Sequence, residues 1–341
     1  MAAPAGPAPA SAWVAVLARY REPDARRSLR ELVVTAAPLA ALWSAALLLV
    51  AQGWWWGMLL CVPAALFLVR LFMILHDCSH GSFFRARAAN DWTGRVIGVL
   101  TLTPYDCWRR LHARHHARSG NLDEPPVGGI ETLAVDDYFR LPPLQRLRYR
   151  LLRHPLVLFG LGPAWLFLLQ QRVPLGLMRE GWRPWASAMG ANLAIAAVAV
   201  AGVALFGAGP FLAVWLTVMI LAGTIGVWLF YVQHQFDGTH WSRRSAWDLH
   251  EAALHGSSWY DLPQPLRWLT ANIGVHHVHH LNSRIPFYRL PEALDDHPQL
   301  KACGRVTLLD SFRTVRLALW DEARGRLVSF REAQAMRAQA A

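Results

Sequence analysis

Histidines are the residues in this chain whose types and spacing point most directly to chemistry. Three short clusters, HDCSH at 76–80, HARHH at 112–116 and HHVHH at 276–280, hold two, three and four of the 15 histidines. In each cluster a histidine recurs after three or four positions, which on a helix places the imidazoles on one face. One such pair is usually structural, whereas three in matching register predict metal binding.

The number of histidines also limits which metal site they could form. Neutral imidazole binds zinc, copper, iron and nickel. A single zinc ion takes four ligands, of which the protein supplies three at a catalytic site. Eight or more clustered histidines therefore predict two metal ions. Two irons that activate O2 fit best, because a redox metal can oxidise a substrate lying in the membrane and zinc cannot.

Long apolar stretches must position these clusters. Of the 341 residues, 54% are hydrophobic and only 17% are charged, whereas a soluble domain carries about 25% charged residues. The mean hydropathy is +0.21. Four stretches are long enough to cross a bilayer, which takes about 20 helical residues; they lie at about 32–51, 54–75, 191–206 and 211–232.

Very short turns, at 52–53 and at 207–210, join these stretches into two transmembrane helical hairpins. A weaker apolar stretch at 156–169 is interrupted by Gly160, Gly162 and Pro163. It is interpreted as a re-entrant or interfacial segment, with a third hairpin as the alternative. The fold class expected is therefore an all-α integral membrane protein in which a cytoplasmic helical cap holds the metal site.

Positive charge predicts the orientation of the spans, because cytoplasmic loops carry an excess of Lys and Arg. Both hairpin turns are uncharged, whereas arginines flank the other ends of the spans, at 19–30, 85–118 and 243–244. The N-terminus, the C-terminus and all three histidine clusters are therefore expected on the cytoplasmic side, in a bacterial inner membrane. The net charge of +11 fits attraction to anionic lipid better than to nucleic acid.

Composition further divides the chain into three expected parts. Residues 1–30 would form a disordered tail and an amphipathic lead-in, because the chain begins with the low-complexity sequence MAAPAGPAPASA. Residues 31–300 would form the membrane domain, and residues 301–341 a cytoplasmic C-terminal tail. The four cysteines show no CxxC spacing and are expected to be free thiols.

The sequence around the clusters resembles a known family. HDCSHGSFF, HARHHARSGNLD, FYVQHQFDGTHW and TANIGVHHVHHLNSRIPFYRL are similar to the histidine-box segments of membrane fatty acid desaturases. They look most like the bacterial acyl-lipid branch that contains delta-12 (omega-6) and delta-5 enzymes. The resemblance extends from about residue 33 to residue 297. The membrane alkane hydroxylases differ in having Glu after the first histidine of the first box.

The resemblance implies a di-iron site and its ligands. The matching positions are His76, His80, His112, His115, His116, His276, His279 and His280, with His234 of VQHQF as a ninth ligand. Asn272 is a candidate for a water-mediated contact, and Asp77 and Asp237 for carboxylates that orient a ligating histidine. His277 would point away from the metals on a helix, as a structural residue.

The resemblance also implies the reaction. A desaturase would use O2, two electrons and two protons to remove two hydrogens from adjacent methylene groups of an acyl-lipid in the bilayer. The chain has no dinucleotide-binding or haem-binding motif, so the electrons would come from a separate ferredoxin-like or cytochrome b5-like donor. Two alternatives stay open: a di-iron lipid or carotenoid hydroxylase or ketolase, and a membrane metal transporter or sensor. The transporter predicts polar side chains within the spans, and these are few.

Overall fold

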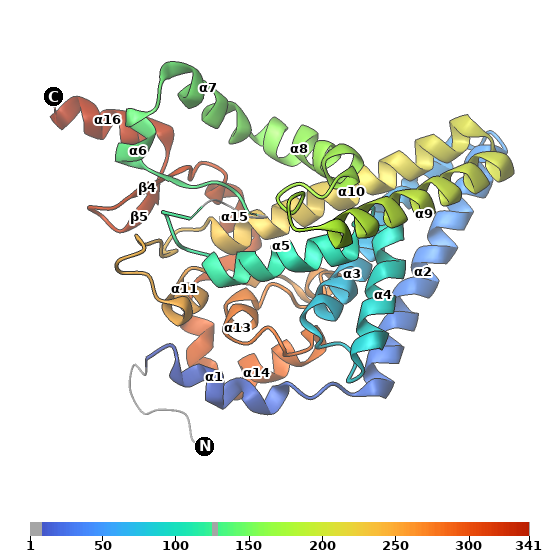
Figure 1. Cartoon of the computed structure of the whole chain (residues 1–341), viewed down its shortest axis with the longest axis horizontal. Coiled ribbons are helices and arrows are strands. Elements are labelled where there is room, and N and C mark those ends of the chain that lie inside the picture. Colours follow the sequence, from blue (N-terminus) through green and yellow to red (C-terminus); the bar gives the residue numbers. More distant parts are fainter. Residues whose placement is uncertain (1–8, 125–128, 341) are drawn as a thin grey trace.

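The protein is described by a computed structural model that covers residues 9–124 and 129–340 (Figure 1). Its framework is four long apolar helices, each able to cross a membrane by length and composition. They are α2 (Ala25–Ala51), α3 (Cys61–His80, preceded by the 3-10 turn η2 at Trp55–Leu60), α9 (Trp182–Phe206) and α10 (Ala208–His234). The expected helical membrane fold is confirmed, and the strands that accompany it have only two or three residues each.

Two tight turns join these helices into the expected hairpins. Gln52, Gly53 and Trp54 separate α2 from η2, and Gly207 alone separates α9 from α10. Gly53 and Gly207 have φ angles of 85° and 82°, in a region that glycine adopts readily and other residues rarely do. Figure 1 shows both turns at the same end of the helical bundle.

The two central helices extend farther than their apolar stretches. α3 continues through the polar sequence HDCSH to His80, and α10 continues to His234. α3 packs against α2, α10 and α4 (Arg87–Leu100), and most of its side chains are buried. The histidines at its end are therefore carried on a helix that its neighbours hold in place.

One charged side chain lies in the middle of this packing. Arg70 of α3 is buried, forms an ion pair with Glu31 of α2 and donates to the backbone carbonyl of Trp268. Its guanidinium also lies 3.9 Å from the centre of the Trp268 ring. A charge within a membrane span is stable only with such partners. Arg70 therefore ties the first hairpin to the segment around Trp268, which follows the last span.

The stretch at 156–169 forms part of a bent helical segment. It comprises α7 (Pro143–Leu152), η3 (Val157–Leu161), α8 (Gly162–Ala164), η4 (Trp165–Leu169) and η5 (Gln170–Arg172). The two halves of this segment meet at an angle of 61°, which suits a broken span or a re-entrant loop. It packs on α10, where Thr224 donates a 2.7 Å hydrogen bond to the carbonyl of Phe159.

A cap of short elements covers the ends of α3 and α10 opposite the turns (Figure 1). Its helices are α5 (Tyr105–Arg118), α11 (Leu249–His255), α12 (Gln264–Leu269), α13 (His276–Leu281), η6 (Phe287–Arg289) and α14 (Leu290–Asp296). Its two short strands, β2 (Trp259–Asp261) and β3 (Arg305–Thr307), pair in parallel. Two of these helices, α5 and α13, carry the second and third histidine clusters.

The end of the chain is folded onto the protein. After η7 (Pro298–Ala302) come β3, α15 (Leu308–Thr314), β4 (Leu319–Asp321), β5 (Arg326–Val328) and α16 (Phe330–Ala340). β4 pairs in parallel with β1 (Leu133–Ala134), which precedes α6 (Val135–Arg140), and antiparallel with β5. Where the sequence suggested a tail from residue 301, the structure has packed elements: β3 pairs with β2 and β4 with β1. Pairing between segments that are distant in the chain leaves no local signal in the sequence.

The start of the chain shows a similar difference. Residues 1–8 of the expected disordered tail lie outside the described residues. The lead-in that follows forms α1 (Ala12–Leu17) and η1 (Ala18–Tyr20), and Trp13, Leu17 and Tyr20 are buried. The Tyr20 hydroxyl donates a 2.6 Å hydrogen bond to Asp296, at the end of α14. The lead-in is thus held against the cap.

Candidate metal centre

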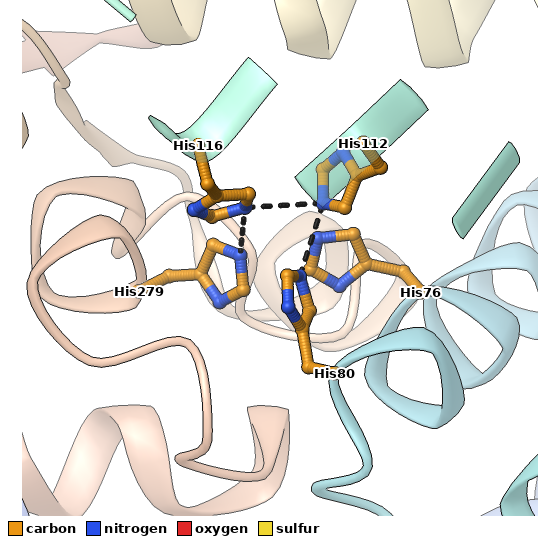
Figure 2. A group of neighbouring side chains, drawn as sticks. All are labelled: His76, His80, His112, His116 and His279. Carbon is orange, nitrogen blue, oxygen red and sulfur yellow. Dashed lines mark hydrogen bonds between the residues drawn. The ribbon is translucent and has the colours of Figure 1, made fainter. Parts of the chain in front are cut away.

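Five histidines from three helices form the first histidine group: His76, His80, His112, His116 and His279. Figure 2 shows their imidazoles converging from α3, α5 and α13. The Nε2 atom of His112 lies 3.0 Å from that of His80 and 3.1 Å from that of His116, and the Nε2 atoms of His116 and His279 are 3.2 Å apart. One nitrogen from each of the five lies within 4.8 Å of the others.

Four histidines form the second histidine group: His115, His234, His276 and His280. The Nε2 atom of His234 lies 3.1 Å from the Nε2 atoms of both His115 and His276. The Nε2 atom of His280 is buried and has no hydrogen-bond partner among the described residues. The two groups are adjacent, since the rings of His116 and His280 stack with their centres 4.1 Å apart.

Helical periodicity explains how two helices serve both groups. On α5, His112 and His116 are one turn apart and enter the first group, while His115 points into the second. α13 shows the reverse arrangement, since His276 and His280 enter the second group and His279 enters the first. The remaining members come from the spans: α3 supplies His76 and His80 to the first group, and α10 supplies His234 to the second.

Burial keeps the cap histidines neutral. The pKa values of His112, His115, His116, His276, His279 and His280 all lie well below their usual range, because burial disfavours the imidazolium form and the other histidines add to this effect. A neutral imidazole presents a free lone pair, which is the form that binds a metal.

The donor set fits two first-row metal ions. Two facing Nε2 atoms can share one proton as a hydrogen bond. The Nε2 atoms of His112, His116 and His234 each face two other imidazole nitrogens, however, and a bound metal ion satisfies such a cluster of buried lone pairs. Nitrogens bound at about 2.1 Å and at right angles would be roughly 3 Å apart, which matches the 3.0–3.2 Å separations. Five imidazoles also exceed the four ligands of a tetrahedral zinc site.

Comparison with known proteins agrees with this geometry. The family model described as "Fatty acid desaturase" matches residues 53–307. The chain belongs to the fatty acid desaturase family. All nine histidines of the two groups lie within the matched residues. The prediction of a desaturase-type oxidoreductase is therefore confirmed at the level of the family.

Individual relatives carry related names. A "Fatty acid desaturase" of Bacillus subtilis is 41% identical over 92% of this chain and 89% of its own length. An "sn-1 acyl-lipid omega-3 desaturase (ferredoxin)" of Synechocystis is 28% identical over 66% of this chain and 62% of its own length. An "sn-1 oleoyl-lipid 12-desaturase" of Synechocystis is 26% identical over 64% of this chain and 62% of its own length.

Asp77 of this desaturase-family chain is buried beside the first group. One oxygen of its carboxylate lies 3.3 Å from Nδ1 of His76, and the other accepts a 2.6 Å hydrogen bond from the backbone N–H of Phe287. A carboxylate on the outer nitrogen of a ligating histidine holds the ring in place. Asp77 therefore links α3 to the segment that follows the third cluster.

Other contacts around the groups were not anticipated from the sequence. Trp108 stacks on the ring of His112 with 4.4 Å between ring centres and 13° between planes. The backbone carbonyl of Gly256 lies 3.2 Å from Nδ1 of His234, and the Ser119 hydroxyl lies 3.4 Å from the same atom. Trp108 lies one helical turn before His112, a signal that could have identified it. Gly256 gives no such signal, because only folding brings its carbonyl to His234.

Three residues considered from the sequence lie outside both groups. His277 is buried, and its Nε2 lies 3.0 Å from the carbonyl of Leu300; burial lowers its pKa to about 4. Asn272 is partly buried and donates a 3.4 Å hydrogen bond to the carbonyl of Phe287. Asp237 is exposed, and its side chain forms no hydrogen bond or ion pair within residues 9–124 and 129–340.

Proposed function

We propose that this chain is an acyl-lipid desaturase that introduces a double bond into a membrane lipid by means of two irons. The observation that carries the proposal is the pair of all-histidine groups at the ends of the membrane helices α3 and α10. The reaction consumes O2, two electrons and two protons, and it releases an alkene and two molecules of water. Two hydrogens leave adjacent methylene carbons of the acyl chain.

In this proposal the first histidine group holds one iron and the second holds the other. Their nine members are His76, His80, His112, His115, His116, His234, His276, His279 and His280. The bound irons supply the redox chemistry with O2 that breaks unactivated C–H bonds, which no side chain of the protein can do. Iron is favoured over zinc because five imidazoles suit a metal of higher coordination number and because zinc has no redox chemistry.

The protein's own residues prepare this site. Burial holds the cap imidazoles neutral, so that metal binding need not displace a proton from each ring. Asp77 holds the ring of His76, and the Gly256 carbonyl holds that of His234. The stacked Trp108 covers one face of His112. These contacts keep water from the rings and limit their rotation.

The relatives' printed names support an acyl-lipid substrate, since the Synechocystis enzymes are named for acyl-lipid and oleoyl-lipid. The acyl chain would reach the metal centre from the bilayer, along the apolar helices that carry the histidines. We place the histidine groups, and both termini, on the cytoplasmic side. The uncharged turns at Gly53 and Gly207 support this orientation.

A separate protein would deliver the electrons one at a time. One Synechocystis relative is named for ferredoxin, and both ferredoxin-like and cytochrome b5-like donors are candidates here. The chain's net charge of +11 would attract an acidic donor to the surface over the histidine groups.

The proposal is tested by expressing the chain in a bacterium that makes no polyunsaturated lipid, followed by mass spectrometry that locates double bonds. The expected product is an acyl chain lighter by two mass units than its precursor. A chain heavier by sixteen mass units would instead identify a hydroxylase. His276→Ala, which removes one of the four histidines of the second group, should reduce the product by more than about 100-fold, whereas the neighbouring variant His277→Ala should retain it. A His276→Ala protein that forms the product at the unmodified level would refute the ligand assignment, and two irons per chain should be found in the purified enzyme.

A further inference from the structure

A pocket at the start of α2 collects arginines from three separate segments. Its volume is about 940 Å³, and it lies between the first turns of α2, the segment after α3 and the segment around η6. Five arginines line it: Arg26, Arg27, Arg30, Arg85 and Arg289. None of them belongs to either histidine group, and the proposed reaction assigns them no role.

Acidic residues balance only part of this charge. Glu292 pairs with Arg289 at 3.1 Å. Glu22 lies 3.6 Å from Arg85, and both of these side chains are largely exposed. Pairs of this kind are weak and exchange readily with another anion.

The three arginines of α2 account for the remaining positive charge of the pocket. Asp24 accepts a hydrogen bond from the backbone N–H of Arg27, and the Arg27 guanidinium donates to the carbonyl of Tyr288 at 2.7 Å. Arg26 and Arg30 are exposed and form no ion pair within the described part of the chain. Two full positive charges therefore face the pocket without a counter-charge from these residues.

Arg26 and Arg30 are one helical turn apart, and like charges at this spacing repel each other. Asp24, the N-cap of α2, accepts the N–H of Arg27 at the helix start, but the first turn itself has no acidic residue to offset Arg26 and Arg30. An anion between the two guanidinium groups would relieve their repulsion. The pocket is thus complementary to a phosphate.

The position of the pocket identifies the source of that phosphate. It lies where α2 emerges from its apolar stretch, and the exposed apolar side chains of Leu29 and Val33 stand beside Arg26 and Arg30 on the same helix. A soluble phosphate would make no favourable contact with these apolar side chains, whereas the acyl chains of a lipid would. We propose that the pocket binds the headgroup phosphate of an anionic phospholipid, whose acyl chains lie along α2.

The pocket wall is also connected to the metal centre. The Tyr288 hydroxyl lies 3.0 Å from the Ser28 hydroxyl and accepts the N–H of Asp24. The preceding residue, Phe287, donates its N–H to Asp77 beside His76. A lipid bound to the arginines therefore stabilises the segment that contacts Asp77, and the melting temperature of the protein should rise on binding.

The test is a thermal-shift titration of the full-length holoenzyme in neutral detergent. The probes are phosphatidylglycerol, phosphatidylcholine and soluble sn-glycerol 3-phosphate. Phosphatidylglycerol should raise the melting temperature saturably, and the other two should not at the same concentration. The double variant Arg26→Gln/Arg30→Gln should weaken phosphatidylglycerol binding by about tenfold to thirtyfold, because each arginine near a membrane surface contributes about 1 kcal/mol.

The matched control is Arg148→Gln/Arg331→Gln, which removes the same charge from exposed arginines elsewhere and should leave binding unchanged. If the double variant does not fold, Arg30→Gln alone should weaken binding about fivefold. Equal weakening by the control variant, or an unchanged affinity in the pocket variant, would overturn the site. An equal response to sn-glycerol 3-phosphate would overturn the lipid assignment. Because the readout needs no turnover, these results are independent of whether the enzyme proves to be a desaturase.

Discussion

The two histidine groups are built from the same parts but are not equal. Each takes members from α5 and α13, the first adds two histidines from α3, and the second adds only His234 from α10. The outer nitrogen of His76 faces the carboxylate of Asp77, whereas that of His234 faces the neutral carbonyl of Gly256. The second group also borders a cavity of about 270 Å³ that His115 and His234 help to line.

The difference suggests separate tasks for the two groups. Five imidazoles and a supporting carboxylate can hold a metal firmly, because loss of one ligand still leaves four. Four imidazoles beside a cavity leave room for an exchangeable ligand but tolerate no loss. Substitutions in one group at a time distinguish these two tasks.

The largest effect is expected for His234→Ala. The second group would keep only three histidines, so the bound metal should fall from two ions to one per chain. Desaturation should fall by more than 100-fold, beyond the roughly 10–100-fold typical of losing a supporting residue. Metal analysis of the purified protein and fatty acid profiling measure the two quantities. Two ions in the variant would contradict the assignment of His234.

His80→Ala tests the same loss in the first group. Four histidines would remain, which is enough for a four-coordinate site, so the metal content should stay near two ions per chain. Activity should still fall by at least about tenfold, because the remaining ligands are rearranged. If His80→Ala and His234→Ala lose metal equally, the proposed difference between the groups is wrong.

The supporting contacts should rank in the opposite order, because the first group has the carboxyl of Asp77 beside it and the second has only a long contact from Ser119. Asp77→Asn keeps the shape of the side chain but replaces the carboxyl group beside His76 with an amide, and activity should fall by about 10–100-fold. Ser119→Ala removes a long contact to His234, whose Nδ1 keeps the Gly256 carbonyl, and activity should fall by no more than about fivefold. Paired kinetic assays at equal metal content make the comparison. A larger loss of activity in Ser119→Ala than in Asp77→Asn would contradict this ranking.

His277→Ala provides a control within the third cluster. Its side chain bonds to the carbonyl of Leu300 rather than to either group, so metal content should be unchanged and activity should stay within about threefold. The free energy of unfolding should fall by roughly 1–3 kcal/mol, because the change leaves a cavity and a buried carbonyl without its partner. Loss of a metal ion from this variant would place His277 among the ligands.

The smallest effect is expected for Asp237→Asn. Asp237 is exposed and lies three residues beyond His234. Neutralising it should change neither metal content nor activity beyond experimental error, since isolated surface substitutions are usually within about 0.5 kcal/mol. A clear loss of metal from the second group would restore the role that its sequence position suggested.

Much of this arrangement was predictable because its signals are local. The four spans follow from runs of apolar residues, and the turns at Gly53 and Gly207 from the breaks between them. The packed ends of the chain were not predictable in this way. Residues 133–134 and 319–320 pair as strands although 186 positions separate them, and Trp13 is buried against His297.

The sequence by itself determined that imidazoles would gather on single faces of helices, because a period of 3.6 residues makes neighbours of positions three and four apart. It also determined that the first cluster lies at the end of a membrane span, because hydropathy is a local property. Only the tertiary structure decided that nine histidines divide into five and four. His116 and His279 face each other across 163 positions, and which nitrogens meet depends on how α5 and α13 cross α3 and α10, an outcome of packing that no local pattern encodes.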